Sequence, residues 1–75
     1  MSAATITLAE RLANRLKDCR AELGVTQAEL AERVGVTRKT VNTVENGIFT
    51  PSATLAIKLA QALGVSVEQL FWIES

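Results

Sequence analysis

The chain has 75 residues with no net charge at neutral pH; 48% of them are hydrophobic, and they include one cysteine and no histidine. This length allows one domain with a single core, the hydrophobic content argues against disorder, and the cysteine and histidine counts exclude an internal disulfide and a Cys/His zinc site. No run approaches the ~20 apolar residues of a membrane span and none has the form of a secretory signal, so we expect a cytoplasmic protein without a membrane partner.

The starts and ends of five helices are marked by residues that cap helices. A hydroxyl followed three residues later by Glu or Gln can form a capping box, and this pattern occurs at Thr7–Glu10, Thr26–Glu29 and Ser66–Gln69, with Thr37 and Ser52 as further N-cap candidates. Glycines, which close helices by adopting positive φ, follow at Gly24, Gly35, Gly47 and Gly64. These signals predict helices at about 8–23, 27–34, 38–46, 53–63 and 67–73, and no strand.

Apolar residues at helical spacing predict which faces of the helices are buried. One stripe on the first helix consists of Leu8, Leu12, Leu16, Cys19 and Leu23, and one on the fourth of Leu55, Leu59 and Leu63. Cys19 is expected to fill space in the core, because its stripe is apolar and no basic group is clearly arranged to activate its thiol. The predicted fold class is therefore all-α, a compact five-helix domain.

Only Gly35, Val36 and Thr37 separate the second predicted helix from the third. A connection this short makes two helices that share a core cross steeply, as in a helix-turn-helix. Such a crossing requires a small residue at the closest approach and a turn residue that tolerates positive φ, which Ala31 and Gly35 provide. Val36 would then fill the gap between the helices.

Burial of Val41 and Val44 would turn the polar side of the third helix outward. That side carries Arg38, Lys39, Asn42, Thr43 and Asn46. In the major groove of B-DNA, Arg and Lys can donate to guanine O6 and N7, and Asn can pair with adenine. At the start of the second helix, Gln27 and the free amides after Thr26 would face a phosphate.

Two stretches, TQAELAERVGVTRKTVNTVENG and TPSATLAIKLAQALGVSVEQLF, resemble the Cro/repressor-type (XRE family) helix-turn-helix transcriptional regulators of phages and bacteria. The resemblance covers residues 14–73 and leaves 1–13 as an N-terminal extension with the start of the first helix. It implies a lambda-repressor-like fold with the helix from Thr37 in the major groove. Where the family often has a basic residue after ENG, this chain has Ile48, followed by Phe49.

The expected DNA contacts combine this resemblance with the outward face of the third helix. Base contacts are expected from Arg38, Lys39, Asn42 and Thr43, and phosphate contacts from Thr26, Gln27, Thr37, Thr40, Asn46 and Thr50. Glu45 would repel a phosphate, so we expect it to pair with Arg20 of the first helix, a salt bridge that the resemblance also implies.

The four apolar residues Leu70–Ile73 cannot all face one core if they lie in a helix, because they span its whole circumference. We expect Leu70 and one aromatic residue to close the core. The remaining apolar surface, drawn from Phe71, Trp72 and Ile73, is assigned to a dimer contact, joined by Ile6 or Leu8 of the extension.

The leading functional hypothesis is a sequence-specific regulator that binds double-stranded DNA as a homodimer on a palindrome. The alternative is a protein-interaction module with the same fold, such as an antitoxin or a bridging factor, which would use the apolar C-terminus to hold a second protein. An enzyme is disfavoured, because the chain has no histidine or tyrosine and its only aspartate is Asp18. No cofactor and no small-molecule ligand are expected.

Overall fold

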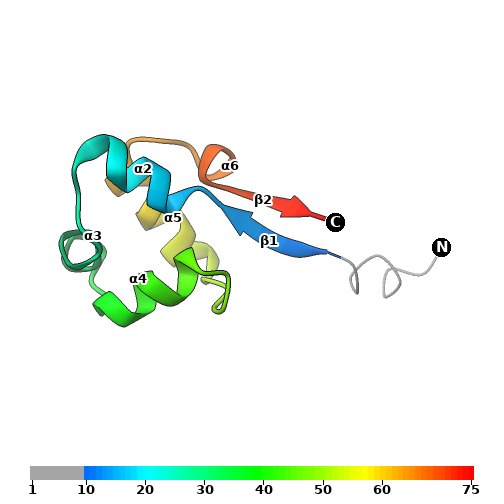
Figure 1. Ribbon diagram of the computed structural model, residues 1–75, viewed down its shortest axis with the longest axis horizontal. Helices are drawn as coiled ribbons and strands as arrows, with labels where there is room; N and C mark the ends of the chain where they lie inside the picture. The colour runs from blue at the N-terminus through cyan, green and yellow to red at the C-terminus, as the bar shows by residue number, and fades with distance from the viewer. Residues whose placement is uncertain (1–9) are drawn as a thin grey trace.

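The computed structural model describes residues 10–75, which form five helices and a two-stranded sheet. In chain order these are β1 (Arg11–Asn14), α2 (Leu16–Leu23), α3 (Gln27–Val34), α4 (Arg38–Glu45), α5 (Ala53–Leu63), α6 (Val67–Leu70) and β2 (Phe71–Glu74). The helices pack together at one end, and the paired strands extend from the other (Figure 1). The structure confirms the predicted five-helix lambda-repressor-like domain and adds a small sheet. Within this described part, no helix is long and apolar enough to cross a bilayer.

Four of the five predicted helix starts carry the expected N-cap hydrogen bond. The hydroxyls of Thr26, Thr37, Ser52 and Ser66 each accept the amide of the residue three positions on, at 3.0–3.2 Å. These bonds satisfy N–H groups that the first turn of a helix leaves without a partner. The fifth predicted start, at Thr7, lies outside the described residues, as do Ile6 and Leu8.

The first predicted helix is wrong over Arg11–Asn14, where the structure has a strand, and α2 begins only at Leu16. β1 pairs antiparallel with β2, so that Leu12 lies opposite Ile73. Leu12 still packs against the core, but it does so from a strand. Pairing with a segment from the other end of the chain decided the conformation here, and the helical spacing of the leucines could not reveal that pairing.

The last predicted helix is wrong over its final three residues. α6 ends at Leu70, and Phe71 has the extended values φ −126° and ψ 143°. Aromatic and β-branched residues such as Phe71, Trp72 and Ile73 favour a strand when a partner strand is present. Because side chains alternate across a strand, the apolar run can divide between two faces, which a helix of one turn does not allow.

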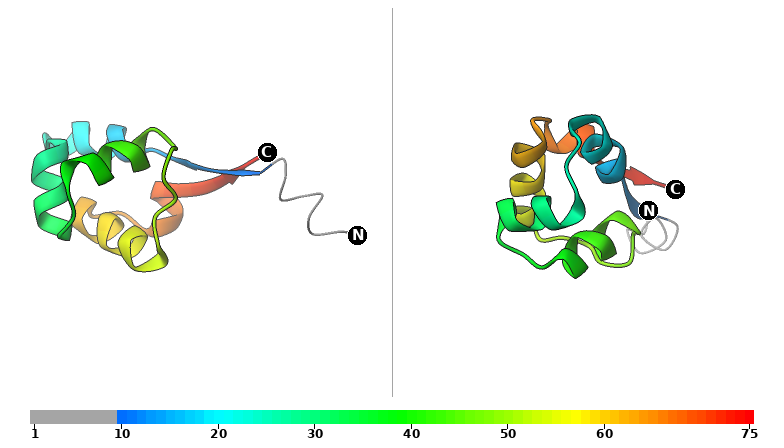
Figure 2. Two further views of the ribbon diagram at one scale, coloured as in Figure 1. Left: turned by 90° about the horizontal axis from the view of Figure 1, so that it is seen from below. Right: turned by 60° about the vertical axis from the view of Figure 1, so that its left-hand side comes forward.

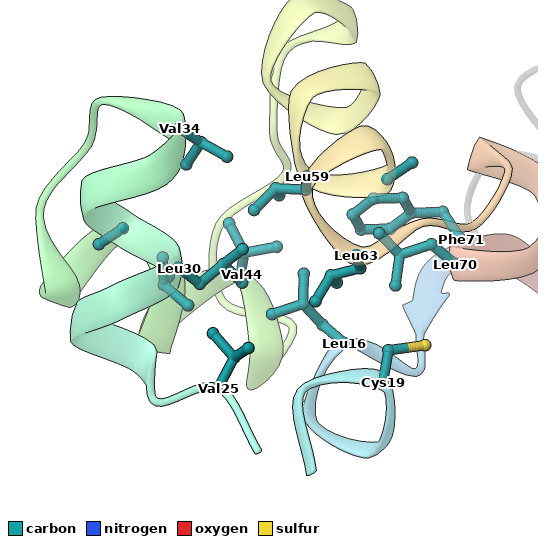
Figure 3. Close-up of a cluster of buried hydrophobic side chains, with 13 residues drawn as sticks. Leu16, Cys19, Val25, Leu30, Val34, Val44, Leu59, Leu63, Leu70 and Phe71 are labelled. Carbon is teal, nitrogen blue, oxygen red and sulfur yellow. The ribbon is translucent and has the colours of Figure 1, made fainter. Parts of the chain in front are cut away.

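The core lies between the five helices, with Phe71 of β2 closing one side (Figure 3). Its largest fully buried side chains are Leu16, Leu30, Leu59, Leu70, Val41 and Val44. Cys19 is buried on α2 as predicted, and burial raises the pKa of its thiol. Apolar surroundings disfavour the thiolate, so this cysteine fills space and is not poised for reaction.

Glu29 makes the capping box of α3 dependent on pH. Its carboxylate accepts the backbone N–H of Thr26 at 3.0 Å, and this hydrogen bond lowers the pKa of Glu29. A carboxyl group whose pKa is lower in the folded state stabilises the fold above its unfolded pKa, and this contribution is lost as the pH falls through the folded value. We therefore expect Glu29→Gln to melt below the wild type at neutral pH and level with it in acid.

Thermal melts of the two proteins at neutral and acid pH check this expectation. Glu32→Gln changes an exposed glutamate of α3 that lies outside the capping box, and it is the matched control. A difference in melting temperature between Glu29→Gln and wild type that is equally large at both pH values would contradict the assignment.

Candidate nucleic-acid interface

The turn between α3 and α4 has the features that the sequence predicted for a helix-turn-helix. Gly35 adopts φ 76°, and the N–H of Val36 donates to the carbonyl oxygen of Ala31 at 3.0 Å. Ala31 is buried, and Val36 is half-buried against the core. α3 and α4 lie beside each other at the end of the domain away from the two strands (Figure 2).

The outward face of α4 carries hydrogen-bond donors at its N-terminal end. Arg38, Lys39 and Asn42 are exposed and line one shallow hollow, while Val41 and Val44 on the opposite side are buried. Among residues 10–75 the ion pairs involve neither Arg38 nor Lys39. Both cations therefore stand in solvent next to the positive end of the α4 dipole.

Three threonine hydroxyls link successive turns of α4. Thr37 caps the helix by accepting the amide of Thr40 at 3.2 Å, and the two hydroxyl oxygens lie 3.0 Å apart. Thr43 is half-buried and donates its hydroxyl proton to the carbonyl oxygen of Thr40 at 2.9 Å. Because its proton is used, Thr43 can offer a base only acceptor lone pairs, which suit the amino groups of adenine or cytosine.

The N-terminus of α3 is partly occupied by its own capping box. The N–H of Thr26 is taken by the Glu29 carboxylate and the N–H of Glu29 by the Thr26 hydroxyl, each at 3.0 Å. The first-turn amides that remain for an anion are those of Gln27 and Ala28. The phosphate site predicted after Thr26 therefore has fewer free amides than expected, and it lies beside the Glu29 carboxylate.

Arg20 and Glu45 form an ion pair that joins α2 to the C-terminal end of α4. The guanidinium Nη2 of Arg20 donates to Glu45 Oε1 at 3.0 Å, and Arg20 Nε donates to Oε2. The side chains are 14% and 5% exposed, and the hydrogen bond to Glu45 raises the pKa of Arg20. Gln27 Nε2 adds a third donor to the same carboxylate, at 3.1 Å from Oε1. The charge of the Glu45 carboxylate is thus neutralised within the domain. Through Gln27, the same carboxylate links α3 to α4.

The loop after α4 uses much of its backbone internally. The N–H groups of Ile48 and Phe49 both donate to the carbonyl oxygen of Thr43, at 2.9 and 3.1 Å. The Asn46 side chain donates to the carbonyl oxygen of Asn42 at 2.8 Å, and Thr50 is exposed. The Ile48 and Phe49 amides are therefore engaged, and a phosphate would have to be bound by side chains of the loop.

Asn14 is a positioning residue that the sequence analysis did not find. Its Nδ2 donates to the carbonyl oxygen of Val44 at 3.0 Å, and its Oδ1 accepts the N–H of Leu16 at 3.0 Å. It therefore fixes the end of β1 to the C-terminal end of α4 and the start of α2. An Asn two residues before a helix is a recognisable turn signal, but the helix predicted over this region concealed it.

The three residues expected at a dimer contact do not share one environment. Phe71 is 7% exposed and belongs to the core, where the sequence predicted that one of the aromatic residues would lie. Trp72 and Ile73 are 36% and 60% exposed. They alternate along β2 and therefore point to opposite faces of the sheet.

A five-helix domain in which α3 and α4 form a helix-turn-helix defines the lambda-repressor-like class. Residues 16–70 match the model of the helix-turn-helix family. The chain belongs to this family and is a DNA-binding transcriptional regulator of the XRE/Cro type.

Similar proteins support the assignment along most of the chain. YgzD, an HTH-type transcriptional regulator of Bacillus subtilis (strain 168), is 44% identical over 61 residues, which are 81% of this chain and 92% of YgzD. The crystal structure of a protein from Bacteroides fragilis has a TM-score of 0.74 at 31% identity, and the match covers 81% of this chain and 98% of that one. SinR, a master regulator of biofilm formation solved in complex with DNA, has a TM-score of 0.67 at 34% identity, with coverage of 72% and 87%.

Proposed function

We propose that the protein recognises specific double-stranded DNA sequences by placing α4 in the major groove. The observation that carries this proposal is the exposed set Arg38, Lys39 and Asn42 on the outward face of α4. Two cations at a helix N-terminus oppose the helix dipole, so they do not serve the stability of the domain. An anionic ligand would neutralise them, and DNA supplies both the charge and the base edges that such donors read.

The contacts divide into base reading and phosphate positioning. Arg38 and Lys39 can donate to guanine, Asn42 can pair with adenine, and Thr43 can accept from an amino group. Phosphate contacts are assigned to exposed and half-buried polar groups at the N-termini of α3 and α4 and in the loop after α4: Thr26, Gln27, Thr37, Thr40, Asn46 and Thr50. Their number is modest, which agrees with a chain of zero net charge.

The proposed binding unit is a homodimer on a palindrome. One recognition helix reads only a few base pairs, too few to distinguish a site among the ~10⁶ or more competing sites of a genome. Two copies related by a two-fold axis would read two half-sites about one helical turn apart. The solved complex of SinR with DNA supports DNA as the ligand of this fold.

Selection of random duplex DNA by the purified protein tests this proposal. We expect enrichment of an inverted repeat whose half-site centres lie ~10 base pairs apart, or a multiple of that. Enrichment of a single unrepeated half-site would contradict the dimer. No enrichment at low salt, where phosphate contacts are strongest, would contradict sequence-specific DNA binding.

A further inference from the structure

We propose that Asn14 is a positioning residue for base reading: its side-chain amide transmits the pairing of β1 with β2 to the orientation of α4. This role depends on the proposed reading of bases by α4, because Asn14 acts on the DNA only through that helix. Asn14 is the last residue of β1 and is half-buried. α4 runs from the α3–α4 turn toward the strands, so its C-terminal end lies beside Asn14 (Figures 1 and 2).

The amide of Asn14 joins two helix ends at once. Its Nδ2 donates to the carbonyl oxygen of Val44 at 3.0 Å and to that of Glu45 at 3.4 Å, while its Oδ1 accepts the N–H of Leu16 at 3.0 Å. The last carbonyls of a helix lack partners within it, as do the first amides. Arg15, the N-cap residue of α2, makes no side-chain capping bond. Asn14 therefore caps the start of α2 and also supplies a donor to the end of α4.

Strand pairing fixes where this amide stands. Asn14 lies opposite Phe71, which is buried in the core. The N–H of the next residue, Arg15, donates to the carbonyl oxygen of Leu70 at 3.0 Å. The backbone around Asn14 is thus tied to the end of α6 and the start of β2, and its side chain extends that fixed position to α4.

Other hydrogen bonds at the end of α4 come from its own loop. The carbonyl oxygen of Thr43 accepts the N–H groups of Ile48 and Phe49, at 2.9 and 3.1 Å. Bonds of this kind move with the helix and cannot orient it within the domain. Asn14 acts from another element, and it binds the backbone of α4 with no intervening side chain.

A small tilt of α4 is enough to spoil base contacts. The helix has eight residues, so its two ends are about 10 Å apart. A tilt of ~10° about the C-terminal end would move Arg38 by about 2 Å, whereas a binding site must hold its groups within ~0.5 Å. Apolar packing of Val41 and Val44 is not directional, while hydrogen bonds are. The bonds from Asn14 therefore limit this tilt.

Coupling of this kind acts in both directions. If the paired strands hold α4 in its reading orientation, then DNA that holds α4 must in turn stabilise the paired strands. Binding of the selected duplex should therefore slow hydrogen exchange at the backbone amides of Arg11–Asn14 and Phe71–Glu74, although no residue of the sheet is assigned to the DNA interface.

Asn14→Ser tests this role without adding charge. A serine hydroxyl can still accept the N–H of Leu16, but it is too short to reach the carbonyl oxygen of Val44. Ser66→Ala is the matched control, because it removes one N-cap hydrogen bond at the start of α6, outside α4 and the sheet. Both variants should fold and melt about 5 °C below the wild type. Affinities for the selected and the scrambled duplex are then measured at one salt concentration, well below the melting temperatures.

We expect the ratio of the two affinities to fall about 10-fold or more for Asn14→Ser and to keep its wild-type value for Ser66→Ala. Hydrogen exchange of the strands should slow on binding in the wild type and in Ser66→Ala, but not in Asn14→Ser. A merely structural role would affect the two variants alike, because their stabilities match.

Asn14→Asp replaces the serine variant if that protein does not fold. Aspartate keeps the shape of the side chain and the acceptor for Leu16, but it has no donor for α4 when ionised. Its charge weakens binding to both duplexes and cancels in the ratio.

An Asn14→Ser protein with the wild-type ratio, or with the wild-type slowing of exchange, would overturn the role of Asn14 and leave base reading intact. A wild type that does not distinguish the two duplexes would instead refute base reading by α4, and the role of Asn14 with it.

Discussion

Replacing Arg20 by alanine is expected to lower the free energy of unfolding by about 3–5 kcal/mol, because the change leaves a carboxylate buried without its cation. The Glu45 side chain is 5% exposed and loses the two hydrogen bonds that Arg20 donates, keeping the one from Gln27. Arg20 also donates to the carbonyl oxygen of Val25 at 3.0 Å, and this bond is lost as well. For a domain of this size each kcal/mol corresponds to roughly 4–8 °C, so the melting temperature should fall by more than ~10 °C.

Thermal and urea unfolding of three variants check this prediction. Arg33→Ala removes an exposed arginine from the last turn of α3 and should leave the melting temperature nearly unchanged. The double variant Arg20→Met with Glu45→Leu removes both charges and should recover much of the lost stability, because an apolar pair of similar volume avoids the unpaired charge. An Arg20→Ala protein that melts with the wild type would remove the ion pair from the account of stability.

The helix-turn-helix could be read from the sequence because its determinants are local. Thr26 and Thr37 start their helices through hydrogen bonds to residues three positions away. Gly35 ends α3 because its backbone adopts positive φ, and Ala31 lies within the same turn of chain. Short-range geometry of this kind leaves a recognisable pattern of residue types.

The sheet could not be read because its determinants are distant. Leu12 continues the helical spacing of Leu16, and nothing near it indicates that Ile73 will lie opposite. Because the strand pairing was not predicted, the role of Asn14 was not predicted either. Asn14 can hold α4 because it stands at the end of β1. Non-local strand pairing overrides a local periodicity whenever the partner segment is available.

The sequence predicted which side chains of α4 are exposed, but it did not predict the hydrogen bonds of the candidate site. Arg38, Lys39 and Asn42 are exposed, as their spacing from Val41 and Val44 indicated. Hydrogen bonds were the part that remained hidden. The sequence gives no sign that Gln27 donates to Glu45 or that the Thr43 hydroxyl is engaged, since both bonds depend on how side chains settle in the folded domain.

Loss of Arg38 and Lys39 together is expected to abolish recognition of the selected duplex. Each base contact made by such side chains contributes about 1–3 kcal/mol of discrimination, and a dimer uses each of them twice. The double alanine variant should keep its fold, because both side chains are exposed and form no ion pair within residues 10–75. Its residual DNA binding should no longer distinguish the selected sequence from a scrambled one.

The most direct test is to measure the affinity of wild type, the Arg38→Ala/Lys39→Ala variant and a Lys17→Ala/Lys58→Ala control for the selected duplex and for a scrambled duplex, at one salt concentration. The control removes the same charge from exposed positions on α2 and α5. Reading of bases by α4 predicts that only Arg38→Ala/Lys39→Ala loses the preference for the selected sequence. The assignment is contradicted if that variant keeps the preference, or if the control loses it equally.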